Sequence, residues 1–104
     1  MSTSDRYREI CRDVSEFQGR LGVEQISDPA VRAIDKACDG LKEWVDQVGD
    51  IPRMRLEHKL TPVLLKAHNN LDRGRLLFEE SGQEDLAAVV WGLQQKIYRL
   101  LNDL

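Results

Sequence analysis

The sequence lacks any long run of apolar residues. Its longest uninterrupted apolar stretch covers residues 86–91, whereas a membrane-spanning helix requires about 20 such residues. The first residues, Met1 to Arg6, are followed by frequent charges rather than by the apolar core of a secretory signal. We therefore expect an intracellular protein that does not span a membrane.

Motifs for metal or cofactor chemistry are also missing. Cys11 and Cys38 lie 27 residues apart without a Cys-x-x-Cys pattern, so both are expected to be ordinary buried or half-buried thiols. His58 and His68 lie ten residues apart, and neither has a Cys or His three or four residues away to complete a metal site. No Gly-rich phosphate loop is present. The sequence predicts no cofactor and no metal.

Acid–base groups occur without a catalytic arrangement. Glu57, His58 and Asp72 could exchange protons, but the sequence indicates no nucleophile and no oxyanion donor that would converge with them. We therefore do not expect an enzyme.

What the sequence does contain suits one compact domain over residues 1–104. Hydrophobic residues make up 41% of the 104 residues and charged residues 32%, without an internal repeat or a low-complexity segment. A chain this short commits most of its apolar residues to its core. Function is therefore expected on loops or on one exposed groove.

Apolar spacing predicts two helices in the first half of the chain. Residues 7–21 place apolar side chains three and four positions apart, on one face of a helix capped by Ser4 or Asp5. A second helix begins after Asp28, a capping residue followed by proline at the first helical position, and continues to residue 48.

The next region contains an interior proline. Pro62 lies ten residues after Pro52, and a proline inside a helix removes a hydrogen bond and clashes with the preceding turn. We therefore predict a short helix over residues 53–60 and a second helix capped by Thr61, with one continuous kinked helix as the alternative. The second helix ends near Leu71 or runs on through residue 78.

A closing helix completes the domain. Ser81-x-x-Glu84 is typical of a capping box, and apolar residues follow at alternating spacings of four and three over residues 86–104. No segment alternates with period two, so strands are not expected. The fold class is predicted to be all-α, a compact antiparallel bundle of four to five helices.

Two conspicuous groups of side chains have structural explanations. Trp44 and Trp91 lie beside the apolar rows of their helices and are predicted to flank the core. Four acidic residues surround the start of the closing helix, where the helix dipole favours carboxylates, and they are predicted to form a solvated helix start. They are Glu79, Glu80, Glu84 and Asp85.

Charge is distributed unevenly along the chain. Residues 53–75 contain six Lys/Arg and two Asp/Glu, a local charge of +4 that leaves −7 on the rest of a chain with net charge −3. This basic side could steer an acidic partner. Leu76, Leu77 and Phe78 follow it directly, and a helix can bury only some of three contiguous apolar residues. The net negative charge argues against a protein that binds nucleic acid on its own.

The sequence has an Ile-Pro pair at 51–52, Thr61 ten residues after Ile51, and then Val63 and Ala67. With these positions, the sequence from about Ile34 onward resembles the TFIIS N-terminal domain family, small helical bundles of transcription and chromatin proteins that include integrase-binding domains. Residues 86–104 resemble the closing helix of the family. The resemblance implies a non-catalytic, nuclear interaction domain that binds short disordered acidic and aromatic motifs of partner proteins.

The resemblance also implies where such a peptide lies, between the loop after the first helix and the basic stretch. Its apolar side chain is expected to contact Val23, Ile26, Leu76 and Phe78. Its carboxylates are expected to contact Lys66, His68, Arg73 and Arg75. Ordering the peptide opposes binding, so the affinity should be modest and should fall as salt is raised.

Two alternatives remain open from the sequence. The first is a self-association module, a homodimer whose seam uses the apolar spacing of the first and last helices. The second is an accessory nucleic-acid-binding domain of a chromatin remodeller that places residues 53–75 on phosphates.

Overall fold

The computed structural model describes residues 2–21 and 28–104, apart from the side chains of residues 53 and 56. These ranges contain four α-helices, a short 3₁₀ helix and no strand. The elements are α1 (Thr3–Leu21), α2 (Pro29–Val45), η1 (Val48–Asp50), α3 (Arg53–Glu80) and α4 (Glu84–Asp103). The all-α prediction is confirmed, with four long helices rather than five.

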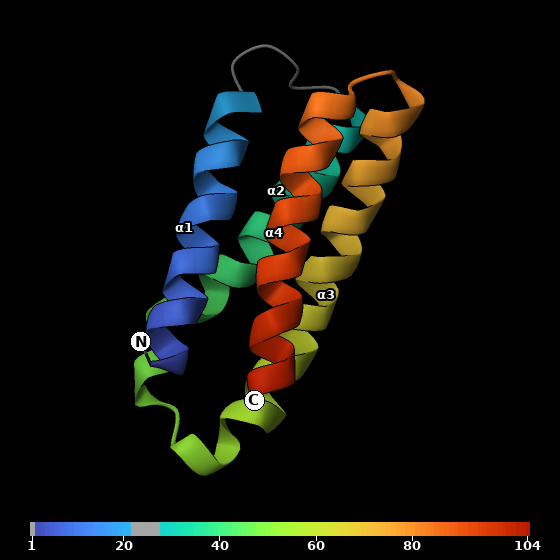
Figure 1. Ribbon diagram of the computed structural model, residues 1–104. Helices are drawn as coiled ribbons and strands as arrows, with labels where there is room; N and C mark the ends of the chain where they lie inside the picture. The colour runs from blue at the N-terminus through green and yellow to red at the C-terminus, as the bar shows by residue number, and fades with distance from the viewer. Residues whose placement is uncertain (1, 22–27) are drawn as a thin grey trace.

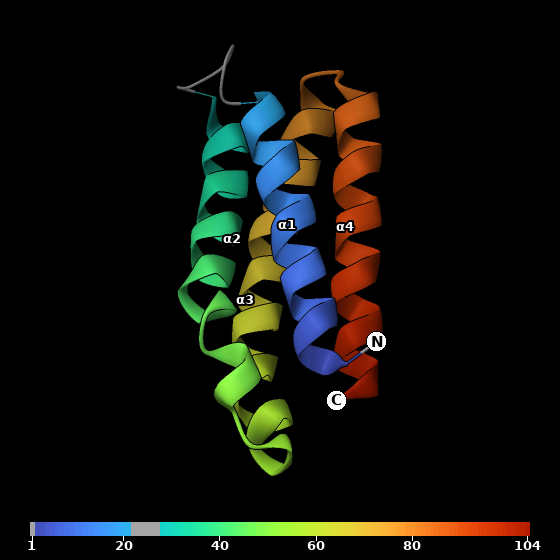
Figure 2. The same ribbon diagram turned by 90° about the vertical axis from the view of Figure 1, so that its left-hand side faces the viewer.

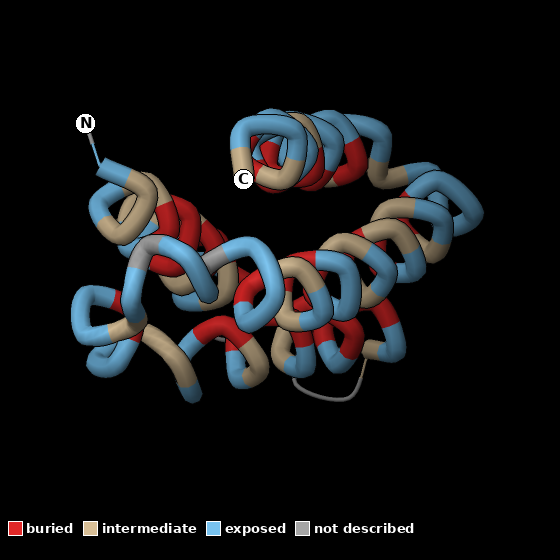
Figure 3. Tube along the Cα trace, turned by 90° about the horizontal axis from the view of Figure 1, so that it is seen from below, coloured by how far each residue is buried: buried red, intermediate tan, exposed pale blue. Residues whose placement is uncertain are grey.

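The helices run alternately up and down, so both termini lie at the same end of the bundle (Figure 1; Figure 2 shows the same from the side). Each helix packs against its neighbour in chain order, and α4 returns to pack against α1. Seen along the bundle, buried residues face the interior of the ring and exposed residues face outward (Figure 3). The predicted antiparallel bundle is therefore confirmed.

The first helix begins earlier than predicted. Ser2 Oγ accepts a hydrogen bond from the backbone N–H of Asp5 at 3.1 Å, and α1 starts at Thr3. The predicted cap at Ser4 or Asp5 is wrong, because Ser, Thr and Asp are all competent caps and four of them stand in a row.

The second helix begins as predicted and ends early. The Asp28 carboxylate accepts a hydrogen bond from the backbone N–H of Ala30 at 2.7 Å, and proline occupies the first turn. α2 stops at Val45, and the buried Val48 belongs to η1 instead. The prediction that the helix continues to residue 48 is wrong because Val48 keeps the apolar spacing but reaches the core from η1.

The predicted break at Pro62 is wrong, and the continuous-helix alternative holds. α3 runs from Arg53 to Glu80 with Pro62 inside it. The side chains of Pro62 and His58 are both exposed. Because proline has no N–H, the carbonyl of His58, one turn earlier in the helix, lacks its helical hydrogen bond. One buried row continues on both sides of the proline, and its packing against α2 and α4 holds the helix together. The row comprises Leu60, Leu64, Ala67, Leu71 and Phe78.

The turn between α3 and α4 differs from the predicted capping box. Ser81 closes α3 rather than opening α4, since its hydroxyl donates to the carbonyl of Phe78 at 3.1 Å. Gly82 follows with φ of 79°, a conformation that only glycine adopts without strain. The residue before α4 is Gln83, which makes no side-chain cap. Gly82 was a stronger indicator of the end of α3 than the Ser81-x-x-Glu84 pattern was of the start of α4.

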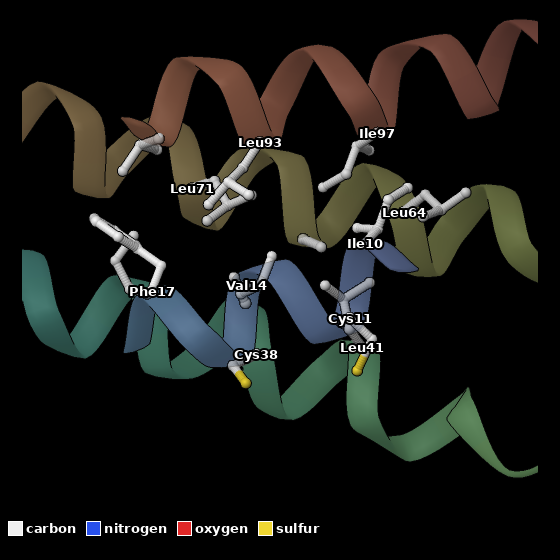
Figure 4. Packing of buried hydrophobic residues seen from close by; sticks show 14 of the residues in the cluster. Ile10, Cys11, Val14, Phe17, Cys38, Leu41, Leu64, Leu71, Leu93 and Ile97 are labelled. Atoms are coloured by element: carbon white, nitrogen blue, oxygen red, sulfur yellow. The ribbon is translucent and has the colours of Figure 1, made fainter. Parts of the chain in front are cut away.

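All four helices contribute to one hydrophobic core. Figure 4 shows Val14 and Phe17 of α1, Leu71 of α3 and Leu93 of α4 reaching into a common interior. Cys38 of α2 is buried at the same core, as is Cys11, so both thiols are buried and free as predicted.

Tyr7 joins α1 to α2 from within the core. Its hydroxyl is buried and donates a hydrogen bond to the backbone carbonyl of Leu41 at 2.6 Å. Burial raises the pKa of the Tyr7 phenol above its ordinary value, and the nearby Cys11 and Glu43 add to the shift. The folded protein therefore retains this proton under conditions where the unfolded chain releases it.

We expect this proton to make the protein unstable in alkali. Above the ordinary tyrosine pKa of about 10, unfolding releases the Tyr7 proton, so stability falls by up to about 1.4 kcal/mol per pH unit. The Tyr7→Phe variant should be less stable than the wild type by about 0.5–1.5 kcal/mol at neutral pH. Its stability should fall less steeply as the pH rises above about 10. Urea unfolding of both proteins across this range measures the difference. Burial also raises the pKa of the Cys11 thiol, but this group is present in both proteins and contributes equally to both. Parallel curves of stability against pH would therefore contradict the role of Tyr7.

Candidate functional site

A continuous groove runs along the outer junction of α2 and α3. Its central hollow has a volume of about 600 Å³, within the range of about 300–1,000 Å³ typical of ligand pockets. Lys36 and Trp44 border it from α2, and Lys66 and Asn70 border it from α3. A second hollow shares Lys36 and Asn70 with it, and a third shares Trp44. The three adjoining hollows form a groove that follows α2 and α3 and continues past the end of α2 over residues 47–52.

Most of the charged side chains that line this groove are basic. Six are Lys or Arg and three are Asp or Glu, although the whole chain has a net charge of −3. Such a surplus of basic side chains favours a positive local potential. We refer to this surface as the basic groove. Its charged residues are Arg32, Lys36, Asp39, Glu43, Asp50, Arg55, Lys59, Lys66 and Arg73.

Trp44 provides the aromatic surface of the basic groove. It is half-buried and packs against the core, as predicted, and it borders two of the three hollows. Val63 and Ala67 line the central hollow from α3. The central hollow thus combines this apolar surface with two basic and two acidic side chains, and further cations lie toward both ends.

Two of the predicted partner-binding residues lie in the basic groove. Lys66 and Arg73 are both exposed and line adjoining hollows. They are seven residues apart, two turns of helix, and so project from the same side of α3. Neither forms an ion pair with any described side chain, which leaves both charges available to a partner.

Arg75, by contrast, lies against α4. Its guanidinium donates to Asp72 at 2.8 Å and to Glu79 at 2.9 Å. It also lies over the Trp91 ring, 5.4 Å from the ring centroid, in a cation–π contact. Its charge is therefore already compensated by two carboxylates.

α3 thus divides the predicted basic set into two pairs. His68 lies two residues after Lys66, which is about 200° of helical rotation, and Arg75 is related to Arg73 in the same way. The pairs project from opposite sides of the helix, so one short peptide in the groove does not reach all four. Of these four residues, only Lys66 and Arg73 line the basic groove.

The predicted apolar contacts are not part of this groove. Phe78 is fully buried and packs edge-to-face on Phe17, with ring centroids 6.4 Å apart. The prediction that Phe78 contacts a partner is therefore wrong. Leu76 is 45% exposed, but it lies on the side of α3 away from the buried row. Val23 and Ile26 lie outside the described residues.

A second surface lies across α3 and α4. Trp91 is 52% exposed, so the prediction that it flanks the core is wrong; its neighbour Val90 takes the inward position instead. The ring borders a hollow that Glu79 and Glu84 also line, and the exposed Asp85 adjoins it. We refer to Trp91, Glu79, Glu84 and Asp85 as the acidic patch.

Asp72 holds Arg75 in place beside this patch. It accepts a hydrogen bond from Nε2 of the fully buried Gln94 at 3.1 Å, in addition to the one from Arg75. These two hydrogen bonds, from Arg75 first and then Gln94, hold the pKa of Asp72 below its usual range. The carboxylate therefore stays ionised and keeps the guanidinium on the Trp91 ring.

The apolar seam proposed for a homodimer is not exposed. Ile10, Val14 and Phe17 of α1, with Val90 and Ile97 of α4, are all buried inside the bundle. Among residues 2–21 and 28–104, no cluster of His, Cys, Asp and Glu is arranged to hold a metal ion. In the same part of the chain, none of the helices is long and apolar enough to cross a membrane.

The α2 side of the groove was not predicted from the sequence. Arg32 and Lys36 are four residues apart and both exposed, a spacing that places them on one outer side of α2. That spacing was a usable signal. The spacing of these two residues does not show that α3 is the helix that lies beside them.

No protein-family model, no curated protein and no solved structure matches this chain. The resemblance to the TFIIS N-terminal domain family therefore remains a prediction from the residues that carry it.

Proposed function

We propose that this protein is a non-catalytic interaction domain that binds short, disordered, acidic segments of partner proteins in the basic groove. The observation that carries the proposal is the position of Trp44, between basic residues toward both ends of one groove. No cofactor is needed. A nuclear setting among transcription or chromatin proteins is the context that the sequence resemblance implies.

The groove favours a peptide that combines carboxylates with one aromatic or large apolar side chain. The apolar side chain would occupy the central hollow beside Trp44, Val63 and Ala67. A carboxylate on one side of it would meet Lys66, Arg73 and their counterparts on α2, and a carboxylate on the other side would meet Arg55 and Lys59. Because these cations are exposed, each contact is weak and screened by salt.

The acidic residues of the groove favour a peptide over nucleic acid. Asp39 and Glu43 border the same central hollow as Lys36 and Lys66. A continuous phosphate backbone would pass these carboxylates and be repelled, whereas a peptide can place an uncharged side chain beside them. The nucleic-acid alternative therefore has less support from this surface.

Reversing two groove charges tests the proposal. Lys66→Glu/Arg73→Glu should weaken binding of a fluorescein-labelled peptide of Asp and Glu residues around a single Phe by about tenfold or more. Fluorescence anisotropy at low salt measures the affinity. Helical circular dichroism should be unchanged, since both side chains are exposed.

A matched control separates the groove from the overall charge. Arg12→Glu/Arg99→Glu changes the net charge equally at exposed positions on α1 and α4 that line none of the three hollows. This variant should retain most of the affinity. Equal losses in the two double variants would mean that the peptide responds only to net charge, and would remove the groove from the proposal.

A further inference from the structure

The acidic patch has the chemistry that the basic groove is proposed to bind. It presents an exposed indole, Trp91, beside the carboxylates of Glu79 and Glu84, with Asp85 one residue further along α4. The one cation lining its hollow, Arg75, is shared between Asp72 and Glu79. The patch is therefore acidic and aromatic, and it belongs to the folded chain itself.

Resting on the proposed function, we propose that the acidic patch of one copy docks into the basic groove of a second copy of this chain. Trp91 of one copy enters the hollow beside Trp44 of the other. The carboxylates of Glu79 and Glu84 then face Lys66 and Arg73. The two surfaces are opposite in charge, which orients the two copies as they meet. Each surface also has a tryptophan, a residue type in which the binding energy of protein interfaces is concentrated.

The position of α3 determines the kind of assembly. The basic groove lies on the α2 side of α3 and the acidic patch on its α4 side, so a chain cannot fill its own groove. Each copy instead offers one surface to each of two neighbours, which is a head-to-tail contact rather than a two-fold one. The contact is weak and salt-sensitive because its charges are exposed. An acidic partner that enters the groove displaces the neighbouring copy.

Two complementary variants test this arrangement. Lys66→Glu/Arg73→Glu reverses the groove and keeps the patch, whereas Glu79→Lys/Glu84→Lys reverses the patch and keeps the groove. At low salt, sedimentation of the wild type should show a mass that rises with concentration. Each variant alone should remain monomeric. An equimolar mixture should associate again, with a mass that rises with concentration. The intact patch of one variant fits the intact groove of the other, and the reversed patch meets a reversed groove of opposite charge.

A mixture that stays monomeric, with both variants folded by circular dichroism, would overturn the self-docking proposal. Trp91→Ala is the second variant in case the patch reversal disturbs the start of α4. It keeps every charge, and it should weaken wild-type self-association about tenfold or more. Unchanged association of Trp91→Ala would also overturn the proposal.

The peptide assay keeps this outcome separate from the proposed function. Glu79→Lys/Glu84→Lys retains its groove and should bind the acidic peptide at least as well as the wild type. Peptide binding without self-association would leave the groove function standing and the self-docking overturned. Self-association of the mixture without peptide binding would mean that the groove recognises only the folded patch.

Discussion

Truncating Phe78 to alanine is expected to lower the free energy of unfolding by about 3–5 kcal/mol. The ring is fully buried and packs edge-to-face on Phe17, so its removal leaves a cavity between α3 and α1. For a domain of this size, such a loss corresponds to a fall in the melting temperature of more than about 10 °C. Urea unfolding and thermal melting by circular dichroism measure both quantities.

The neighbouring Leu76 provides a matched control for Phe78. Leu76→Ala removes an apolar side chain that is already 45% exposed, two positions away on the same helix. Its expected cost is about 1 kcal/mol or less. Peptide affinity per folded molecule should be unchanged in Phe78→Ala, because the ring lies in the core and not in the basic groove. A loss of affinity without a loss of stability would restore Phe78 to the partner surface.

Gly74 is the second position where a substitution should have a large effect. It is buried where α3 crosses α2, and a Cβ added there would lie 2.8 Å from Ile34 Cδ1 and 3.4 Å from the backbone carbonyl oxygen of Ala30. In Gly74→Leu, a Cβ at this position requires the end of the Ile34 side chain to move, and leucine adds three further carbons to the buried contact. We expect a loss of about 2–3 kcal/mol, even though leucine is the better helix former.

Gly92 serves as the matched control for Gly74. It also lies inside a helix, but it is exposed and a Cβ added there meets nothing within 4 Å. Gly92→Leu should therefore gain up to about 1 kcal/mol from helix propensity alone. The two substitutions are chemically identical, so the difference in urea midpoint isolates the contact between α3 and α2. A gain in stability for both would show that this contact has room for a side chain.

The helices and their buried faces were largely predictable from residue spacing. The spacing of α1 and α4 identified their inward rows, and the Asp28-Pro29 pair located the start of α2. The two cysteines were correctly predicted to be buried. These features depend on local rules, namely the 3.6-residue repeat and the capping of free N–H groups, and local rules are written in the sequence.

The errors arose where a local rule competed with packing. Pro62 disfavours a helix locally, but the buried row on both sides of it packs against two other helices and outweighs one missing hydrogen bond. At Ser81 several residues were competent caps, and the positive φ of Gly82 decided where α3 ends. The course of α3 through Pro62 cannot be decided from the neighbouring residues alone, whereas Gly82 was a local signal for the end of α3.

The candidate site shows the same division. The sequence by itself determined the composition of the basic stretch and the all-α character of the chain. Only the tertiary structure decided that Lys66 and Arg73 share a groove with Trp44, while Arg75 is bound on the far side of α3 by Asp72 and Glu79. The physical reason is that helical periodicity determines which side of its own helix a residue occupies. Which helix packs against that side depends on contacts between residues distant in sequence.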